Sequence, residues 1–156
     1  MTFKEELEQI LSEELIIVQQ LKEISFKKTD MIIGNKVEDL ENTTKKEEAL
    51  INQMGLLEEK RIRLLDTWGL NVNTPISNLI DKIQEDKREL LHIIEELTIS
   101  LEELSTRNIL NNDLIQENLD WVDFNMNLIT QAESPTSYGK GNDNKPGSTS
   151  IFDRKV

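Results

Sequence analysis

The spacing with the clearest chemical meaning in this sequence is Glu89-Leu90-Leu91-His92, the Glu-x-x-His pattern of carboxylate-bridged di-iron sites. A site of that kind needs two such motifs, and His92 is the only histidine in the chain. His92 also lies off the apolar stripe through Leu90 and Ile94, which is typical of an exposed histidine on a helix. We therefore expect no metal site.

Other catalytic chemistry finds little support. The chain has no cysteine, which excludes a thiolate nucleophile, a disulfide and a cysteine-based zinc site. A single histidine gives no convincing Ser/His/Asp arrangement, and no glycine-rich phosphate loop follows a strand. Carboxylates are plentiful, but none has a recognisable pocket. We predict that the protein is not an enzyme and uses no cofactor.

The charge of the chain limits its partners. The net charge is −12, and because residues 134–156 carry +2, the first 133 residues carry −14. An acidic body without a basic face repels the phosphate backbone, so nucleic acid is not a predicted partner. The longest apolar run, Leu15-Ile16-Ile17-Val18, is too short to span a membrane, and the N-terminus lacks the pattern of a secretion signal. These features predict a soluble, cytoplasmic protein without membrane insertion.

The elements that would position any site are helical. Apolar residues recur at helical spacing through residues 1–133, which we predict to be one domain, and Thr2-Phe3-Lys4-Glu5 has the spacing of a capping box. The predicted fold is all-α, an elongated antiparallel bundle of three or four long helices with coiled-coil-like packing. Gly34-Asn35 predicts a turn, with a kinked continuous helix as the alternative. The predicted helices are about 3–33, 36–68, 75–104 and 107–133, followed by a disordered tail over 134–156.

The boundary between the last two helices depends on a change of phase. The stripe from Ile76 to Leu104, apolar except at Lys87, alternates spacings of four and three, the 3.5-residue repeat of helices packed side by side. Carried forward, this register meets Asn108 and Asn111, whereas apolar residues resume shifted by one position. The shift predicts that the helix turns a different face, or bends, near residues 105–112. The alternative is one unbroken helix from Pro75 to about residue 133.

The last helical segment is more apolar than one packing face requires. Trp121 and Phe124 are two of only seven aromatic residues in the chain. A wide core-facing helix is one interpretation, and an open groove for a partner helix, favoured by aromatic anchors and an adaptable methionine, is the other. Acidic surroundings would favour a partner with basic or amide-rich flanks. The candidate binding residues are Leu114, Ile115, Leu119, Trp121, Val122, Phe124, Met126, Leu128 and Ile129.

Four stretches taken in order resemble one protein family. They are "KKEEALINQMGLLEEKRIRLL", "NILNNDLIQENLDWVDFNMNLIT", "SYGKG" and "IFDRKV". Their order, from about Gly34 onward, is similar to that of the FlgN family, the flagellar type III export chaperones for the hook-associated proteins of the hook–filament junction. The order is more specific than any single piece, because Leu/Glu-rich helices are common to many coiled coils.

The resemblance implies a cytoplasmic, all-helical chaperone without ATPase activity. Such a chaperone would bind the C-terminal helical segments of the junction proteins, prevent their premature assembly and deliver them to the export apparatus. The implied cargo-binding segment is 114–129. The implied docking residue for the cytoplasmic domain of the membrane export gate is Tyr138, the only tyrosine, with the export ATPase complex as a further candidate partner. Phe152 remains open as the alternative anchor of the tail.

Two other functions remain open from the sequence. The protein could be a chaperone for a different flagellar cargo, such as flagellin or the filament cap. It could also be a scaffold that pairs with itself through its 3.5-residue repeats, since the sequence does not distinguish a monomer from a dimer.

Overall fold

The computed structural model describes residues 1–131, with side chains described as far as residue 129. Its regular elements are the helices α1 (Phe3–Ile33), α2 (Val37–Thr67), α3 (Ile76–Lys82) and α4 (Arg88–Gln131). This part of the chain contains helices and no strand, which confirms the all-α prediction. The predicted tail, 134–156, lies outside the described residues.

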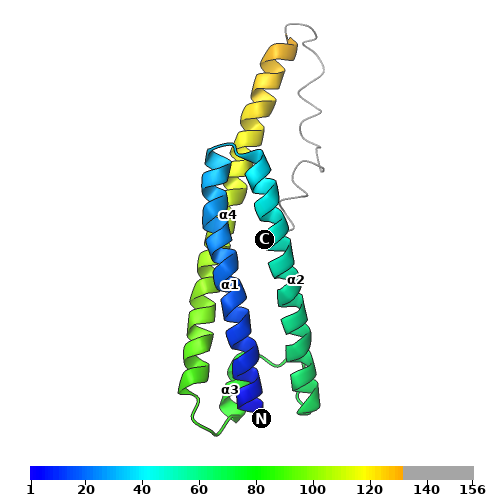
Figure 1. Ribbon diagram of the computed structural model, residues 1–156, viewed down its shortest axis with the longest axis vertical. Helices are drawn as coiled ribbons and strands as arrows, with labels where there is room; N and C mark the ends of the chain where they lie inside the picture. The colour runs from blue at the N-terminus through cyan, green and yellow to red at the C-terminus, as the bar shows by residue number, and fades with distance from the viewer. Residues whose placement is uncertain (132–156) are drawn as a thin grey trace.

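Three long helices lie side by side, with α1 packed along both α2 and α4 (Figure 1). The chain runs up through α1, down through α2 and up again through α4, while the short α3 lies at the base near the N-terminus (Figure 1). The α1 and α4 helices are therefore parallel to each other and antiparallel to α2. Side chains bond across the two parallel helices, as in the bond of 2.9 Å from Lys22 Nζ to a carboxylate oxygen of Glu103.

Both ends of α1 follow the sequence signals. The Thr2 hydroxyl accepts a hydrogen bond from the Glu5 amide at 3.2 Å, and the Glu5 carboxylate accepts one from the Thr2 amide at 3.0 Å, completing the predicted capping box. After α1 the chain reverses, with Asn35 in a left-handed conformation (φ 54°) that asparagine tolerates better than most residues. The amide of Lys36 donates to the Met31 carbonyl at 2.9 Å. The predicted turn is confirmed, and the kinked continuous helix is wrong.

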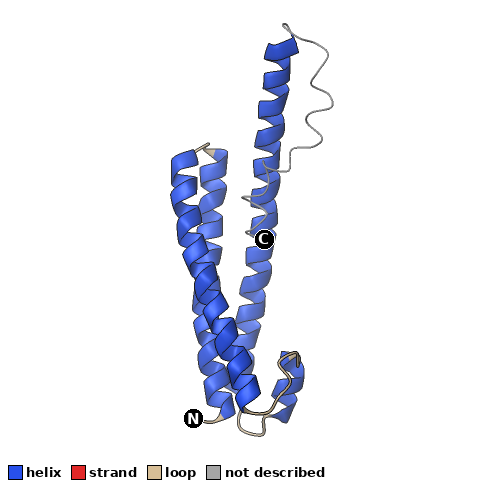
Figure 2. Cartoon of the chain, turned by 90° about the vertical axis from the view of Figure 1, so that its right-hand side faces the viewer, coloured by secondary structure: helices blue, strands red, loops and turns tan. Residues whose placement is uncertain are grey.

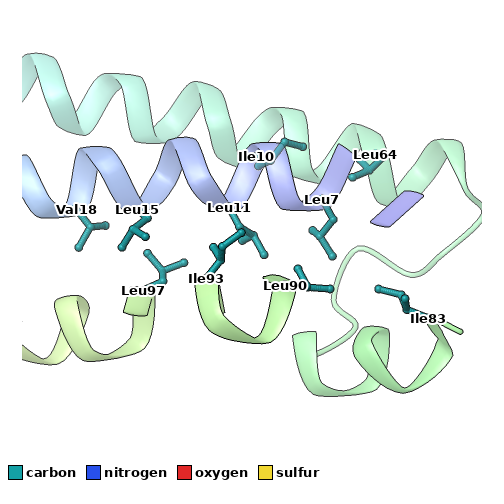
Figure 3. Close-up of a cluster of buried hydrophobic side chains, with 10 residues drawn as sticks. All are labelled: Leu7, Ile10, Leu11, Leu15, Val18, Leu64, Ile83, Leu90, Ile93 and Leu97. Atoms are coloured by element: carbon teal, nitrogen blue, oxygen red, sulfur yellow. The ribbon is translucent and has the colours of Figure 1, made fainter. Parts of the chain in front are cut away.

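The apolar core occupies the lower half of the bundle, where α1 meets the start of α4 and the end of α2 (Figure 3). Burial of these branched side chains is the main stabilising contribution, at about 1.5–3 kcal/mol for each fully buried one. The cluster consists of Leu7, Ile10, Leu11, Leu15, Val18, Leu64, Ile83, Leu90, Ile93 and Leu97.

The predicted helix over 75–104 is wrong, because it is interrupted between α3 and α4. The Lys87 ammonium, which the 3.5-residue repeat placed in the apolar stripe, donates to the Ile80 carbonyl at the end of α3, at 3.0 Å. The Asp86 carboxylate accepts a hydrogen bond from the Arg88 amide at 3.1 Å, just before α4 begins. These local bonds satisfy helix ends and so favour two helices over one. Hydrogen bonds from Arg88 also lower the pKa of Asp86.

The predicted boundary between residues 104 and 107 is also wrong, because α4 runs through it without a break. The asparagines that seemed to interrupt the packing register face α1 and form hydrogen bonds with it. The Ser25 hydroxyl donates to Asn108 and the Thr29 hydroxyl donates to Asn111, both at 2.6 Å. The side-chain amide of Asn111 in turn donates to the Ser25 carbonyl at 2.9 Å. Polar partners on α1 therefore replace apolar contacts and keep α4 in one register.

A buried ion pair joins α1 to α2 in the same upper half. The Lys28 ammonium lies 3.2 Å from a carboxylate oxygen of Glu47, and the two side chains are only 4% and 3% exposed. Buried charges of this kind must be paired, because desolvation of either one alone is costly. The pair thus sets how the upper part of α2 lies against α1.

Candidate functional site

The end of α4 extends beyond the rest of the bundle. The side-chain amide of Asn118 donates to the Ile32 carbonyl at 3.4 Å, so the end of α1 lies level with Asn118. Residues 119–131 continue the helix by about 20 Å. Figures 1 and 2 show this part of α4 rising past the turn that joins α1 to α2. We call residues 119–131 the projecting end.

Most of the predicted binding residues lie on the projecting end and are exposed. Their exposed fractions run from 47% to 69%, which is high for large apolar side chains on a structured helix. The interpretation of this segment as a wide core-facing helix is therefore wrong for these residues. They are Trp121, Val122, Phe124, Met126, Leu128 and Ile129.

The other three predicted residues lie lower on α4. Ile115 is buried, with 9% of its surface exposed, and belongs to the packing of the bundle. Leu114 and Leu119 are half-buried. The nine predicted residues thus extend from the bundle interior onto an exposed helix end, and Leu119 marks the transition.

The nine residues form two stripes and not one surface. At 3.6 residues per turn, the centres of the stripes lie roughly 135° apart around the helix axis. A single straight partner helix covers one stripe and not both. The inner stripe, which continues the face that packs on α1, consists of Ile115, Leu119, Val122, Met126 and Ile129. The outer stripe consists of Leu114, Trp121, Phe124 and Leu128.

An apolar pocket of about 230 Å³ lies where the inner stripe meets the α1–α2 turn. Its walls come from α1, α2, α4 and the α1–α2 turn. The carbonyls of Asp30, Met31 and Ile32 already accept hydrogen bonds from amides of that turn. We call this the tip pocket. It is lined by Met31, Ile32, Asn35, Lys36, Val37, Leu40, Ile115, Asn118, Leu119 and Val122.

Acidic residues accompany the apolar stripes. Residues 113–129 contain Asp113, Glu117, Asp120 and Asp123, and no lysine or arginine. The local field on the described side chains is therefore negative, and it favours a partner with basic residues beside its apolar face.

The α1 and α2 residues of the tip pocket are not among the predicted binding residues. Met31, Val37 and Leu40 flank the Gly34-Asn35 turn, and only that flanking position could have indicated them. Predicted docking residue Tyr138 lies outside the described residues.

The predictions of no metal site and no membrane span concern features that the described residues can show. Within residues 1–131, no group of three or more histidine, cysteine or acidic side chains is placed to hold a metal ion. His92 is exposed, and its Nε2 lies 3.3 Å from a carboxylate oxygen of Glu96. None of the helices over this range is long and apolar enough to cross a membrane.

A helical scaffold that exposes an apolar helix end beside a pocket is typical of proteins that bind amphipathic helices of other chains. The chain belongs to the FlgN protein family, whose model matches residues 1–146, and this is a family of flagellar export chaperones. The match includes α1, where the sequence alone gave no resemblance. The uncharacterized protein YvyG of Bacillus subtilis strain 168 is 26% identical over 127 residues, covering 80% of this chain and 79% of that protein. No solved structure matches the chain.

Proposed function

We propose that this protein is the cytoplasmic chaperone that binds the C-terminal helical segments of the hook-associated junction proteins and delivers them to the flagellar type III export apparatus. Membership of the FlgN family supports the general role of flagellar export chaperone. The observation that carries the binding role is the projecting end of α4, where large apolar side chains are exposed on a helix that the bundle holds in place.

The physical basis of the proposal is that the cargo helix and the projecting end each expose apolar side chains that a partner would cover. A protein awaiting export must stay unfolded, so an amphipathic helix that later packs within the filament has no apolar partner. The projecting end supplies such a partner and opposes aggregation and premature assembly. Ordering the cargo segment costs entropy, which keeps the complex reversible and lets the export apparatus remove the cargo.

Delivery would use the tail. In this proposal Tyr138 binds the cytoplasmic domain of the export gate while the projecting end holds cargo, and the export ATPase complex is a further partner. The tail follows the projecting end directly in sequence, so cargo and gate would lie close together. Phe152 is the alternative aromatic anchor within the same tail.

A calorimetric titration tests the proposal. The full chain is titrated with the C-terminal segments of the two junction proteins of the same organism, and with a flagellin C-terminal segment as the control. One-to-one binding of the junction segments alone is the expected result. Preferential binding of the flagellin segment would indicate a chaperone for flagellin and not for the junction proteins. Binding of none of the segments, together with a stable homo-oligomer in light scattering, would favour the self-associating scaffold.

A further inference from the structure

The tip pocket lies at the end of α1. Beyond this point the face of α4 that packs on α1 continues, and no helix within residues 1–131 covers it. We propose that the cargo helix docks end-on beyond α1, packs along the inner stripe of α4, and inserts one large apolar side chain into the tip pocket. The cargo helix then occupies the position that a longer α1 would occupy. This inference rests on the proposed function and deepens it, because it assigns the α1–α2 turn to the binding site and fixes the register of the cargo.

Continuity with the interface between α1 and α4 is the first argument. Near the end of α1, Ile32 is buried, and Ile115 is buried on the facing side of α4. Further along the same stripe Leu119 is half-buried, and Val122 and Ile129 are exposed. The apolar stripe that begins at Ile115, beneath the end of α1, therefore continues beyond Ile33 on the same face of α4. Its length of about 20 Å suits a partner helix of nearly four turns.

The lining of the tip pocket is the second argument. Apolar side chains from α1, α2 and α4 make most of its wall, and Asn35, Lys36 and Asn118 add polar groups. The carbonyls of Asp30 and Met31, in the last turn of α1, accept hydrogen bonds from the turn. A side chain entering the pocket thus meets apolar surface and not unpaired backbone, which favours an aliphatic or aromatic group.

Charge identifies the kind of chain that would fit. A second copy of this protein packed along the inner stripe would bring two acidic segments together, since residues 113–129 carry four carboxylates and no basic group. A segment of another chain with lysine or arginine beside its apolar face has the complementary charge. The occupant is therefore an amphipathic cargo helix with basic flanks.

Filling the pocket from within tests the proposal. Val37 lines the pocket and is 59% exposed, so Val37→Phe adds bulk at the pocket wall without disturbing the core. The matched control is Ile33→Phe, because Ile33 is close in sequence, is 70% exposed and does not line the pocket. Circular dichroism should show the same helix content in both variants and in the wild type.

The readout is calorimetric affinity for a junction-protein C-terminal segment that the wild type binds. We expect Val37→Phe to bind it about tenfold to a hundredfold more weakly, which corresponds to loss of one buried apolar side chain, and Ile33→Phe to bind it normally. In an alanine scan of the segment, one apolar position should lower the affinity for the wild type when replaced, and leave the affinity for Val37→Phe unchanged. Light scattering at the same concentrations reports any self-association.

Three results would overturn the inference. Undiminished binding by Val37→Phe would show that the pocket is not used, while the proposed function would stand on the binding itself. Equal weakening in both variants would place the effect outside the pocket. A wild-type dimer that Val37→Phe converts to a monomer would make a second copy the occupant.

Discussion

The buried pair of Lys28 and Glu47 gives the sharpest prediction about what holds α1 and α2 together in the upper half of the bundle. Replacing Glu47 with alanine leaves the Lys28 ammonium in a site where its side chain is 4% exposed. Removing one member of a buried pair typically costs about 3–5 kcal/mol. At roughly 2–4 °C per kcal/mol for a chain of this size, the midpoint of thermal unfolding should fall by about 6–20 °C.

Urea unfolding followed by circular dichroism measures this free energy. The companion double variant, Lys28→Met with Glu47→Leu, replaces both charges by apolar groups of similar volume and should recover most of the stability. A loss below about 1 kcal/mol in Glu47→Ala would refute the reasoning, because it would mean that water reaches the ammonium in solution. A double variant as unstable as the single one would show that the charges themselves are needed.

Four further predictions concern single features of the chain. Val122→Ala combined with Ile129→Ala, on the inner stripe, should weaken cargo binding in calorimetry and leave helix content nearly unchanged, since both side chains are exposed; Trp121→Ala combined with Phe124→Ala, on the outer stripe, should weaken it less, and an unfolded variant of either kind would contradict their placement. Asn111→Leu should lose about 1–3 kcal/mol in urea unfolding, because it removes hydrogen-bond partners from two buried hydroxyl groups. Burial raises the pKa of Glu14, so the folded protein loses stability as the pH rises from 4.5 through that raised pKa. Glu14→Gln removes this loss and should raise the midpoint of unfolding at pH 7. The gain should shrink on acidification towards pH 4.5. Tyr138→Ala should leave cargo affinity unchanged and reduce swimming motility, and full motility would remove its docking role.

The sequence predicted helix ends well where the residues that form the end lie close together in the chain. The Thr2 capping box and the Gly34-Asn35 turn both depend on residues within a few positions, and both are confirmed. The all-helical class followed from periodicity. The relation between α1 and α4 did not follow, because the partners of Asn108 and Asn111 lie more than eighty residues away on α1. Without those partners, the asparagines read as a change of phase.

The candidate site was predicted in composition and not in shape. The apolar character of residues 114–129 is visible in the sequence, but their exposure depends on where α1 ends relative to α4. That relation is fixed by the Asn118 bond to Ile32 and by the unbroken course of α4 through the asparagines. A helix boundary near residue 105, as predicted, gives no reason for the end of α4 to project beyond α1. The exposure of the stripes and the tip pocket therefore could not be predicted.

The division of the bundle into an apolar lower half and a polar upper half has a consequence for local stability. Amide hydrogens near the leucine cluster should exchange only on global unfolding, whereas those near Ser25, Thr29 and Asn111, which lie outside that cluster, should exchange through smaller local openings. The upper half should therefore open and close at a fraction of the total unfolding free energy. At the proposed cargo site, this gradient would let the tip adjust to different partner helices while the base remains folded.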